Sequence, residues 1–356
     1  ERWFQYDASQ FQADTAKAQY NLAQQQLIVD LATAYFDVLR AQDTVITTKA
    51  TETAIQKQYD QAQERFDVGL IAITEVYETR ASYDAAKSNR IAAENQLNVA
   101  REQLARLTGE YSVNHANLLQ EFPMSRPTPM DANAWETTAL SQNWSIQAAA
   151  SRLDAEDAGL DAVKSRHLPT LDLTATYNET SYGSGASVFT RGSTDTVIGV
   201  QLTVPLYEGG GTQASVRQQR SLVTAVEEDL NTARRDVVVN TRSLFLTVNN
   251  NIETALALRQ TIVSRRSALD ATRAGYEVGT RNIVDVLDAE QAYYMALRDY
   301  ANVRYDYIIN SLQLKQTAGT LSPQDLMELN TWLSDNARGI EALANESETI
   351  GNPTPR

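Results

Sequence analysis

Cysteine is absent from this chain of 356 residues, and histidine occurs only twice, as His115 and His167. These absences exclude a disulfide framework, thiol chemistry and the usual cysteine and histidine zinc sites. We interpret the two histidines as ordinary residues of a connector and of a helix corner. The composition therefore predicts a protein with no metal site and no cofactor.

Positive charge is scarce as well, because 31 lysines and arginines stand against 45 aspartates and glutamates, for a formal net charge of −14. Nucleic acids need a basic surface to bind their phosphates, so DNA and RNA are excluded as partners. The sequence also contains no apolar run of the roughly 20 residues that a membrane-spanning helix needs. If the chain crosses a membrane, we expect it to do so with β-strands.

Helical periodicity, in contrast, fills most of the chain. Apolar residues recur at spacings of three and four, which is typical of α-helix, over residues 5–66, 75–107, 132–166, 212–276 and 283–318. The longest of these helices would extend for about 100 Å at 1.5 Å per residue. This length favours an elongated bundle of helices over a globular domain.

Much of the chain is a tandem duplication with an offset of 210 residues. Val68–Gly69 matches Val278–Gly279, and Leu107–Gly109 matches Thr317–Gly319. Because this repeat is far longer than a solenoid unit, each copy is a whole structural half. Residues 131–210 precede the second copy, and we expect about 80 corresponding residues to be missing before the first.

Each copy contains a glycine turn between two long helices, at Val68–Leu70 and at Val278–Thr280. After the first turn, Thr74 and Glu75 can begin the returning helix as a polar cap and an acidic first turn. Gly109 is a typical C-terminal glycine for that helix. We therefore predict two antiparallel helical hairpins.

Asp285 and Asp288 follow the second turn at a spacing of three, which places both carboxylates on one face of a helix. A solvated helix face would explain this pair. An acid and base pair of an enzyme is disfavoured, because the sequence offers no enclosing fold, metal cluster or nucleophile arrangement. We expect the protein not to be an enzyme.

Within residues 167–210 the period changes from 3.6 to 2, which predicts two strands of about ten residues, each with one apolar face. The apolar positions are Leu171, Leu173, Ala175 and Tyr177, then Ile198, Val200, Leu202, Val204 and Leu206. A half-buried hairpin on a soluble core is the alternative, but the other long segments are all helical. Strands that are apolar outside and polar inside are what a transmembrane barrel requires, so we favour that interpretation.

The glycines Gly209–Gly211 follow the second strand and open a helix, superficially like a phosphate-binding loop. The GK[ST] ending and a parallel sheet are both missing, so we interpret them as a flexible corner.

The remaining segments are short. Residues 111–131 contain three prolines and indicate a connector that can hold one short helix, and residues 321–333 predict another short helix beside it. The last residues predict a disordered tail. The organisation is thus a first helical hairpin, a connector, a helix of the second copy, a transmembrane β-hairpin, a second helical hairpin, a short segment and a tail, over residues 1–110, 111–131, 132–166, 167–210, 211–319, 320–336 and 337–356.

Six segments carry a close resemblance to a known family, and together they span essentially the whole chain. They are Ala34–Phe36, Arg65–Leu70, His167–Ala175, Val204–Gly210, Gly275–Ala289 and Ala318–Leu321. With their proline and glycine corners, these segments resemble the outer membrane factors, the efflux and secretion channels in the outer membrane of Gram-negative bacteria.

The resemblance implies a fold that is mainly α with a transmembrane β-hairpin: a long antiparallel α-helical coiled-coil barrel in the periplasm, and a 12-stranded β-barrel shared by a homotrimer. It implies an exit duct for tripartite drug efflux pumps and type I protein secretion, seated in outer-membrane lipid. The implied partners are a periplasmic adaptor (membrane fusion protein) and an inner-membrane RND, ABC or MFS transporter. Each chain of such a trimer contributes four strands. This sequence supplies one β-hairpin, so the missing N-terminal segment should hold the second hairpin.

Such channels are closed at the periplasmic end by links among a tyrosine, an arginine and acidic or polar residues, and two aspartate rings line the entrance. The matching link positions are Tyr276, Arg281, Thr74, Glu75 and Glu64. Glutamates at 64 and 75 depart from the family pattern of glutamine and aspartate, so the links can be wired differently. The ring positions are Asp285 and Asp288.

We expect the two turns to receive the helical-hairpin tip of the adaptor. The docking residues are Val68, Gly69, Leu70, Val278, Gly279 and Thr280. The alternative function is a structural periplasmic or surface coiled-coil rod without a conducting pore. The alternating strands favour the channel, because a rod has no use for a hairpin with an apolar outer face.

Overall fold

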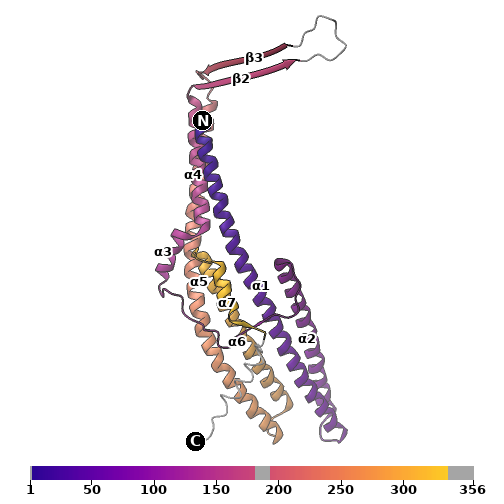
Figure 1. The fold of residues 1–356 in the computed structure, drawn as a ribbon. Helices are drawn as coiled ribbons and strands as arrows, with labels where there is room; N and C mark the ends of the chain where they lie inside the picture. Colours follow the sequence, from indigo (N-terminus) through magenta and orange to yellow (C-terminus); the bar gives the residue numbers. More distant parts are fainter. Residues whose placement is uncertain (1, 181–192, 336–356) are drawn as a thin grey trace, which may run out of the picture. The chain divides into compact units, whose positions relative to one another are not determined.

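The structure, a computed structural model, describes residues 2–180 and 193–335 (Figure 1). Its elements are α1 (Arg2–Asp67), α2 (Ile73–Thr108), β1 (Asn117–Leu118), α3 (Ala132–Gln142), α4 (Trp144–Lys164), a 3₁₀ turn (Ser165–His167), β2 (Thr170–Thr180), β3 (Ser193–Thr203), α5 (Gly211–Glu277), α6 (Ile283–Thr317), α7 (Pro323–Asn330) and β4 (Leu333–Ser334). The fold is mainly α, and its four longest helices coincide with predicted ones. The predicted tail lies outside the described residues, as does most of the loop between the strands.

The chain divides into two compact units. The first contains residues 1–20 and 144–234, and the second contains residues 21–143 and 235–356, so α1 and α5 each contribute to both. In the first unit α4 packs along the beginning of α5, where Gln219 Nε2 donates to Glu156 Oε2 at 2.6 Å. Among the described residues, no helix is long and apolar enough to span a bilayer.

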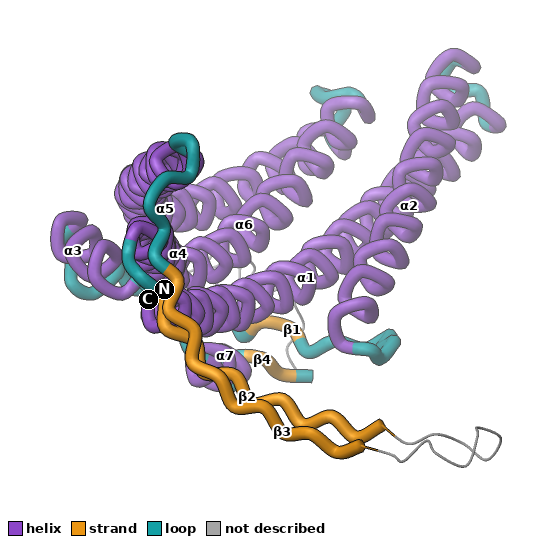
Figure 2. The backbone as a smooth tube through the Cα atoms, turned by 90° about the horizontal axis from the view of Figure 1, so that it is seen from above, coloured by secondary structure: helices purple, strands orange, loops and turns teal. Residues whose placement is uncertain are grey.

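The first unit also holds the antiparallel hairpin of β2 and β3 (Figure 2). Its register sets apolar residues opposite one another: Leu171 with Leu202, Leu173 with Val200 and Ala175 with Ile198. Directly opposite residues share a face of the sheet, so the hairpin has the predicted apolar face. Every residue of β2 is exposed. β3 ends at Thr203, short of the predicted Leu206, because Pro205 has no N–H to donate to the ladder.

The second unit contains two helical hairpins, α1 with α2 and α5 with α6, whose turns lie at the same end of the unit (Figures 1 and 2). Gly69 and Gly279 have φ of +78° and +79°, in the left-handed region that favours glycine. Thr74, in contrast, does not cap α2 as predicted. The helix begins at Ile73, two residues before the predicted start at Glu75, with Ala72 at the cap position and no side-chain cap bond, so Thr74 lies inside the first turn.

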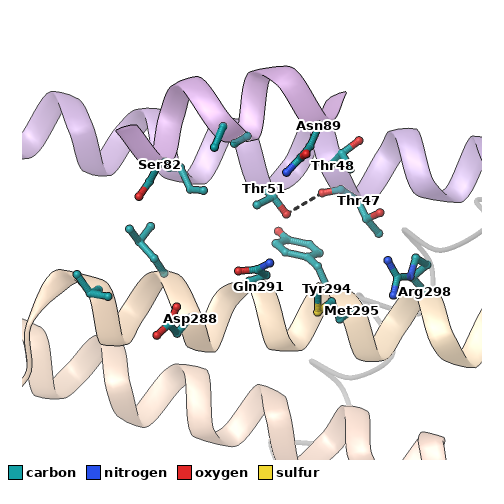
Figure 3. Close-up of a pocket in the computed structure, with 15 residues that line it drawn as sticks. Thr47, Thr48, Thr51, Ser82, Asn89, Asp288, Gln291, Tyr294, Met295 and Arg298 are labelled. Atoms are coloured by element: carbon teal, nitrogen blue, oxygen red, sulfur yellow. Dashed lines mark hydrogen bonds between the residues drawn. The ribbon is translucent and has the colours of Figure 1, made fainter. Parts of the chain in front are cut away.

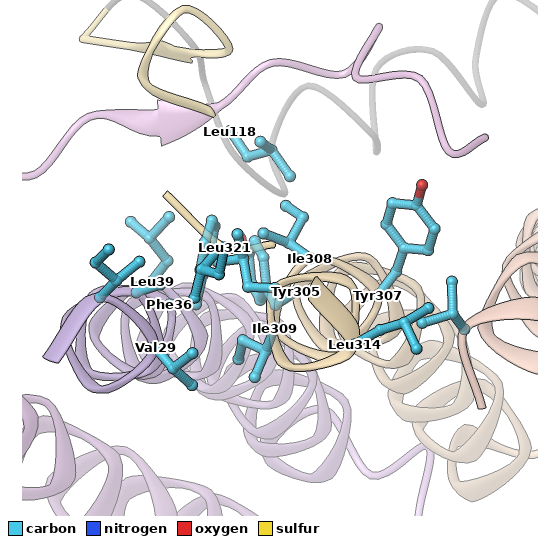
Figure 4. Packing of buried hydrophobic residues seen from close by; sticks show 14 of the residues in the cluster. Val29, Phe36, Leu39, Leu118, Tyr305, Tyr307, Ile308, Ile309, Leu314 and Leu321 are labelled. Carbon is cyan, nitrogen blue, oxygen red and sulfur yellow. The ribbon is translucent and has the colours of Figure 1, made fainter. Parts of the chain in front are cut away.

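The core of the second unit fixes α6 on α1 (Figure 4). Phe36 and Leu39 of α1 are fully buried, and the Tyr305 ring lies 5.5 Å from that of Phe36. Tyr305 donates its hydroxyl proton to Asp43 Oδ2 at 2.7 Å. Burial holds the pKa of Tyr305 well above its ordinary value, and the Asp43 carboxylate raises it further. A buried carboxylate that accepts this bond helps to set the register of the two helices, since a shift of one helix along the other would break the bond.

Part of the connector, residues 111–131, packs against this core as the short strand β1. Leu118 of β1 is buried and pairs with Leu333 of β4 (Figure 2). Residues 111–131 contain no helix, although the sequence allowed a short one there. Three prolines interrupt helical bonding in this stretch, and the pairing with β4 satisfies the backbone of β1 instead.

The predicted single helix over residues 132–166 is wrong in one respect, because Asn143 breaks it into α3 and α4. Asn143 has an extended backbone with ψ of 126°, and its Nδ2 donates to the Thr317 carbonyl oxygen at 2.8 Å. The break lies against Gly319, where a Cβ would come within 2.2 Å of the Gln142 carbonyl oxygen. The break is thus built by tertiary contact with the end of α6.

Gly319→Ala should therefore destabilise the protein far more than Gly109→Ala. The two glycines are equivalent in the duplication and have φ of +75° and +76°, so alanine costs roughly 1 to 2 kcal/mol of backbone strain at either. A Cβ at position 109 would meet nothing within 4 Å, whereas at 319 it would clash with backbone, for roughly 1 to 3 kcal/mol more. Thermal unfolding of the two variants in detergent checks this, and equal losses would contradict it.

Candidate functional site at the helical turns

The turn between α5 and α6 is built around Gly275. Its carbonyl oxygen accepts from the Thr280 N–H at 2.9 Å, the Arg281 N–H at 3.2 Å and the Thr280 hydroxyl at 3.0 Å. A Cβ on Gly275 would lie 2.8 Å from Arg281 Cγ. Only glycine therefore leaves room for the Arg281 side chain in this position, which aims it along the start of α6.

Asp285 has a structural role that the sequence analysis missed. Its backbone N–H donates to Asn282 Oδ1 at 2.8 Å, and its Oδ2 accepts from the Asn282 N–H at 3.2 Å, which is a reciprocal capping box. Arg281 Nη1 lies 3.9 Å from Asp285 Oδ2. Asp288, by comparison, is exposed. An Asn followed three residues later by an acidic residue is a readable capping signature, so the sequence did contain the signal.

Tyr276 contacts a residue that was not predicted. The Arg65 guanidinium of α1 lies over the Tyr276 ring, 5.0 Å from its centroid, as a cation–π pair. This contact links the first helical hairpin to the second at their turns. No sequence signal identified it, because the two residues are more than 200 positions apart.

The structure does not bring the other predicted link residues to Arg281. Glu64 and Thr74 are exposed, and Glu75 is half-buried in the first turn of α2. Within residues 2–180 and 193–335, no ion pair joins Glu64 or Glu75 to Arg281, whose carboxylate partner is Asp285. The acidic links to positions 64 and 75 stay predictions.

The predicted docking residues are exposed at both turns. Val68 and Leu70 are 70% and 73% exposed, and Val278 is 74% exposed. Solvated apolar side chains on two short turns at one end of the unit offer a contact surface. A Cβ added at Gly69 or Gly279 would meet nothing within 4 Å, so both turns are open to an approaching partner.

A polar cleft of about 420 Å³ lies between the two hairpins, behind the turns (Figure 3). Thr47, Thr51 and Asn89 of the first hairpin line it, with Asp288 and Tyr294 of α6 opposite. Burial raises the pKa of Tyr294, and the neighbouring Glu290 carboxylate raises it further. Among the described residues, no group of histidines and carboxylates gathers as a metal site would require. The cleft offers hydrogen bonds and a tyrosine that stays neutral.

Comparisons with known proteins match this chain throughout. Residues 2–110 and 135–320 match the family described as "Outer membrane efflux protein". Outer membrane protein TolC of Escherichia coli is 40% identical over 349 residues, which cover 94% of this chain and 69% of TolC. Alkaline protease secretion protein AprF of Pseudomonas aeruginosa is 29% identical, over 91% of this chain and 69% of AprF. The CmeC outer membrane channel of Campylobacter jejuni has a similar fold, with a TM-score of 0.75 at 17% identity, over 99% of this chain and 72% of that one.

Proposed function

Because the chain belongs to the outer membrane efflux protein family, we propose that it is a trimeric channel-tunnel whose periplasmic end opens when an adaptor and an inner-membrane pump dock. It is an exit duct in the outer membrane of a Gram-negative bacterium, for efflux and type I protein secretion. Its class is a transport channel rather than an enzyme.

The observation that carries the trimer is the hairpin of β2 and β3. It exposes both faces, and within the described residues each strand pairs only with the other, which leaves two open edges. Open edges are not tolerated in lipid, because their N–H and C=O groups find no partner there. Three chains that each contribute strands close these edges in one barrel of 12 strands. The helical hairpins then form the periplasmic tunnel.

The test uses the full-length protein extracted from outer membranes. Native mass spectrometry in detergent should give a trimer, and the same preparation should conduct ions in a planar bilayer. A stable monomer with an intact membrane domain would overturn the trimer. A trimer that is soluble without detergent and never conducts would favour the coiled-coil rod.

Adaptor docking at the turns predicts that Gly279→Trp abolishes export. A bulky side chain would occupy the open surface at the second turn, and the residue would also be strained at φ of +79°. Gly279→Ala carries the same strain without the bulk, so it is the matched control and should retain most of the export and adaptor crosslinking. Normal drug export and normal adaptor crosslinking by the tryptophan variant would exclude docking at this turn.

A further inference from the structure

An ion pair between a half-exposed arginine and a buried glutamate joins α5 to α6 just behind the second turn. The Glu290 side chain is only 7% exposed, and its Oε1 accepts from Arg273 Nη2 at 2.7 Å. Arg273 stands three residues before Tyr276, so one helical turn of α5 separates the ion pair from that ring. Burying an unpaired carboxylate costs free energy of folding. Arg273 of α5 is therefore strongly held opposite Glu290 of α6.

A second arginine of α5 extends this contact away from the turn. The Arg266 guanidinium lies 5.6 Å from the centroid of the Tyr293 ring of α6. Arg266 and Arg273 are seven residues apart, which places them on the same side of α5. Leu269, between them, is 2% exposed and packs with Tyr293 and Leu297. The end of α5 is thus held on α6 by alternating ionic and apolar contacts.

The packing against α1 is much looser at this height. A cavity of about 940 Å³ lies between α1 and the second hairpin, with Lys57 and Gln58 of α1 on one side and Arg273, Glu290 and Tyr294 on the other. The Oε1 atom of Gln58 is buried without a hydrogen bond. Packing on α1 therefore leaves the end of α5 room to move, and the contact with α6 has to fix it.

The first helical hairpin has no ion pair at the equivalent positions, and the pair that joins its α1 to α2, Glu52 with Arg90, lies farther from the turn. Its equivalent residues in the duplication are Gln63 and Arg80. Gln63 Nε2 donates to Asp67 Oδ1 at 2.9 Å within α1 itself, and Arg80 is exposed. The turn residues differ in the same way, because Phe66 and Ile71 stand at the equivalents of Tyr276 and Arg281. The ion pair occurs on the same hairpin as Tyr276 and Arg281.

We propose that Arg273 and Glu290 are positioning residues of the gate: their ion pair holds the last turn of α5 in register on α6 and so fixes Tyr276 and Arg281 in the closed arrangement. This rests on the proposed gate at the turns. Breaking the pair should let the end of α5 shift into the loosely packed space and weaken every link that Tyr276 makes.

The experiment measures single-channel conductance of the full-length trimer in planar bilayers. Glu290→Gln and Arg273→Met should each raise the resting conductance several-fold, and the charge reversal Arg273→Glu with Glu290→Arg should return it close to the parent value. Arg80→Met, at the equivalent position of the first hairpin, is the matched control and should change nothing. Glu290→Gln keeps the size of the side chain, so it decides the matter if Arg273→Met fails to assemble.

A second readout uses a spin label on Val278→Cys, because these 356 residues contain no other cysteine that could react with it. The label distances between copies should lengthen in Glu290→Gln and recover in the reversal variant. A pair that only stabilises the fold would lower the unfolding temperature and leave both conductance and distances unchanged, which would overturn the inference. The variant Tyr276→Phe with Arg281→Ser separates the two proposals. If it opens the channel and the pair variants do not, the positioning role is wrong; if none of them does, the gate itself is wrong.

Discussion

Changing Tyr276→Phe and Arg281→Ser together is expected to raise the single-channel conductance several-fold without dissociating the trimer. The change removes the tyrosine hydroxyl and the arginine charge from the second turn, but leaves an aromatic ring for Arg65 to lie over. Conductance therefore reports the polar links alone. Each link that water can reach contributes about 0.2 to 1 kcal/mol, so several links in three chains add up to a closed state that docking can overcome.

Arg80→Ser provides the control, because it removes one exposed cation from the first hairpin, on α2 behind the first turn. Its conductance should equal that of the parent. The unfolding temperature of both variants should stay close to the parent value, since the Arg281 and Asp285 side chains are partly exposed and their pairing adds little to stability. Parent-like conductance of the double variant would mean that Tyr276 and Arg281 do not close the entrance.

The second large effect concerns the two aspartates of α6. Asp285→Asn with Asp288→Asn should abolish block by trivalent cations applied from the periplasmic side. Two carboxylates from each of three chains would form a ring at the entrance, and such a ring prefers cations, above all multivalent ones. Asparagine is the better test than alanine at position 285, because its side-chain oxygen can still accept the bond from the Asn282 N–H that caps α6.

The two gate variants are expected to give different results. The variant Tyr276→Phe with Arg281→Ser should have a higher conductance and should still be blocked by trivalent cations. The variant Asp285→Asn with Asp288→Asn should lose the block. The single variants Asp285→Asn and Asp288→Asn show how much each aspartate contributes to the block. We expect the exposed Asp288 to contribute more than Asp285, which is engaged in the cap of α6. If the aspartate-free channel is blocked as readily as the parent, the carboxylates are an ordinary solvated face.

Local sequence signals predicted the elements well. The helices are long and periodic, and glycines with positive φ mark four of their ends, at Gly69, Gly109, Gly279 and Gly319. The hairpin followed from alternation, and its one error, the end at Leu206, came from discounting Pro205. A glycine or proline ends a helix or strand within a few residues of its own position, so these boundaries can be predicted from the local sequence.

The errors arose where the cause lies far away in sequence. Asn143 breaks a periodic helix because Thr317 and Gly319 meet it from the end of α6, and no pattern within residues 132–166 records that contact. Arg65 was overlooked for the same reason. The sequence analysis did not single out Glu290 either, because its partner Arg273 lies seventeen positions away on another helix.

The short ladder of β1 and β4 has a consequence for how the chain folds. It pairs Asn117 with Ser334 and so closes a loop of more than 200 residues. Closing such a loop lowers the entropy of the chain before any stabilising contact has formed. Contacts between residues this far apart in sequence therefore slow folding. The α1–α2 hairpin involves only neighbours in sequence, so it can form as soon as its residues reach the periplasm. Leu118, however, can be buried only after β4 has also arrived there. Until then the apolar face of α1 around Phe36 stays uncovered, and we expect the chain to depend on chaperones over that interval.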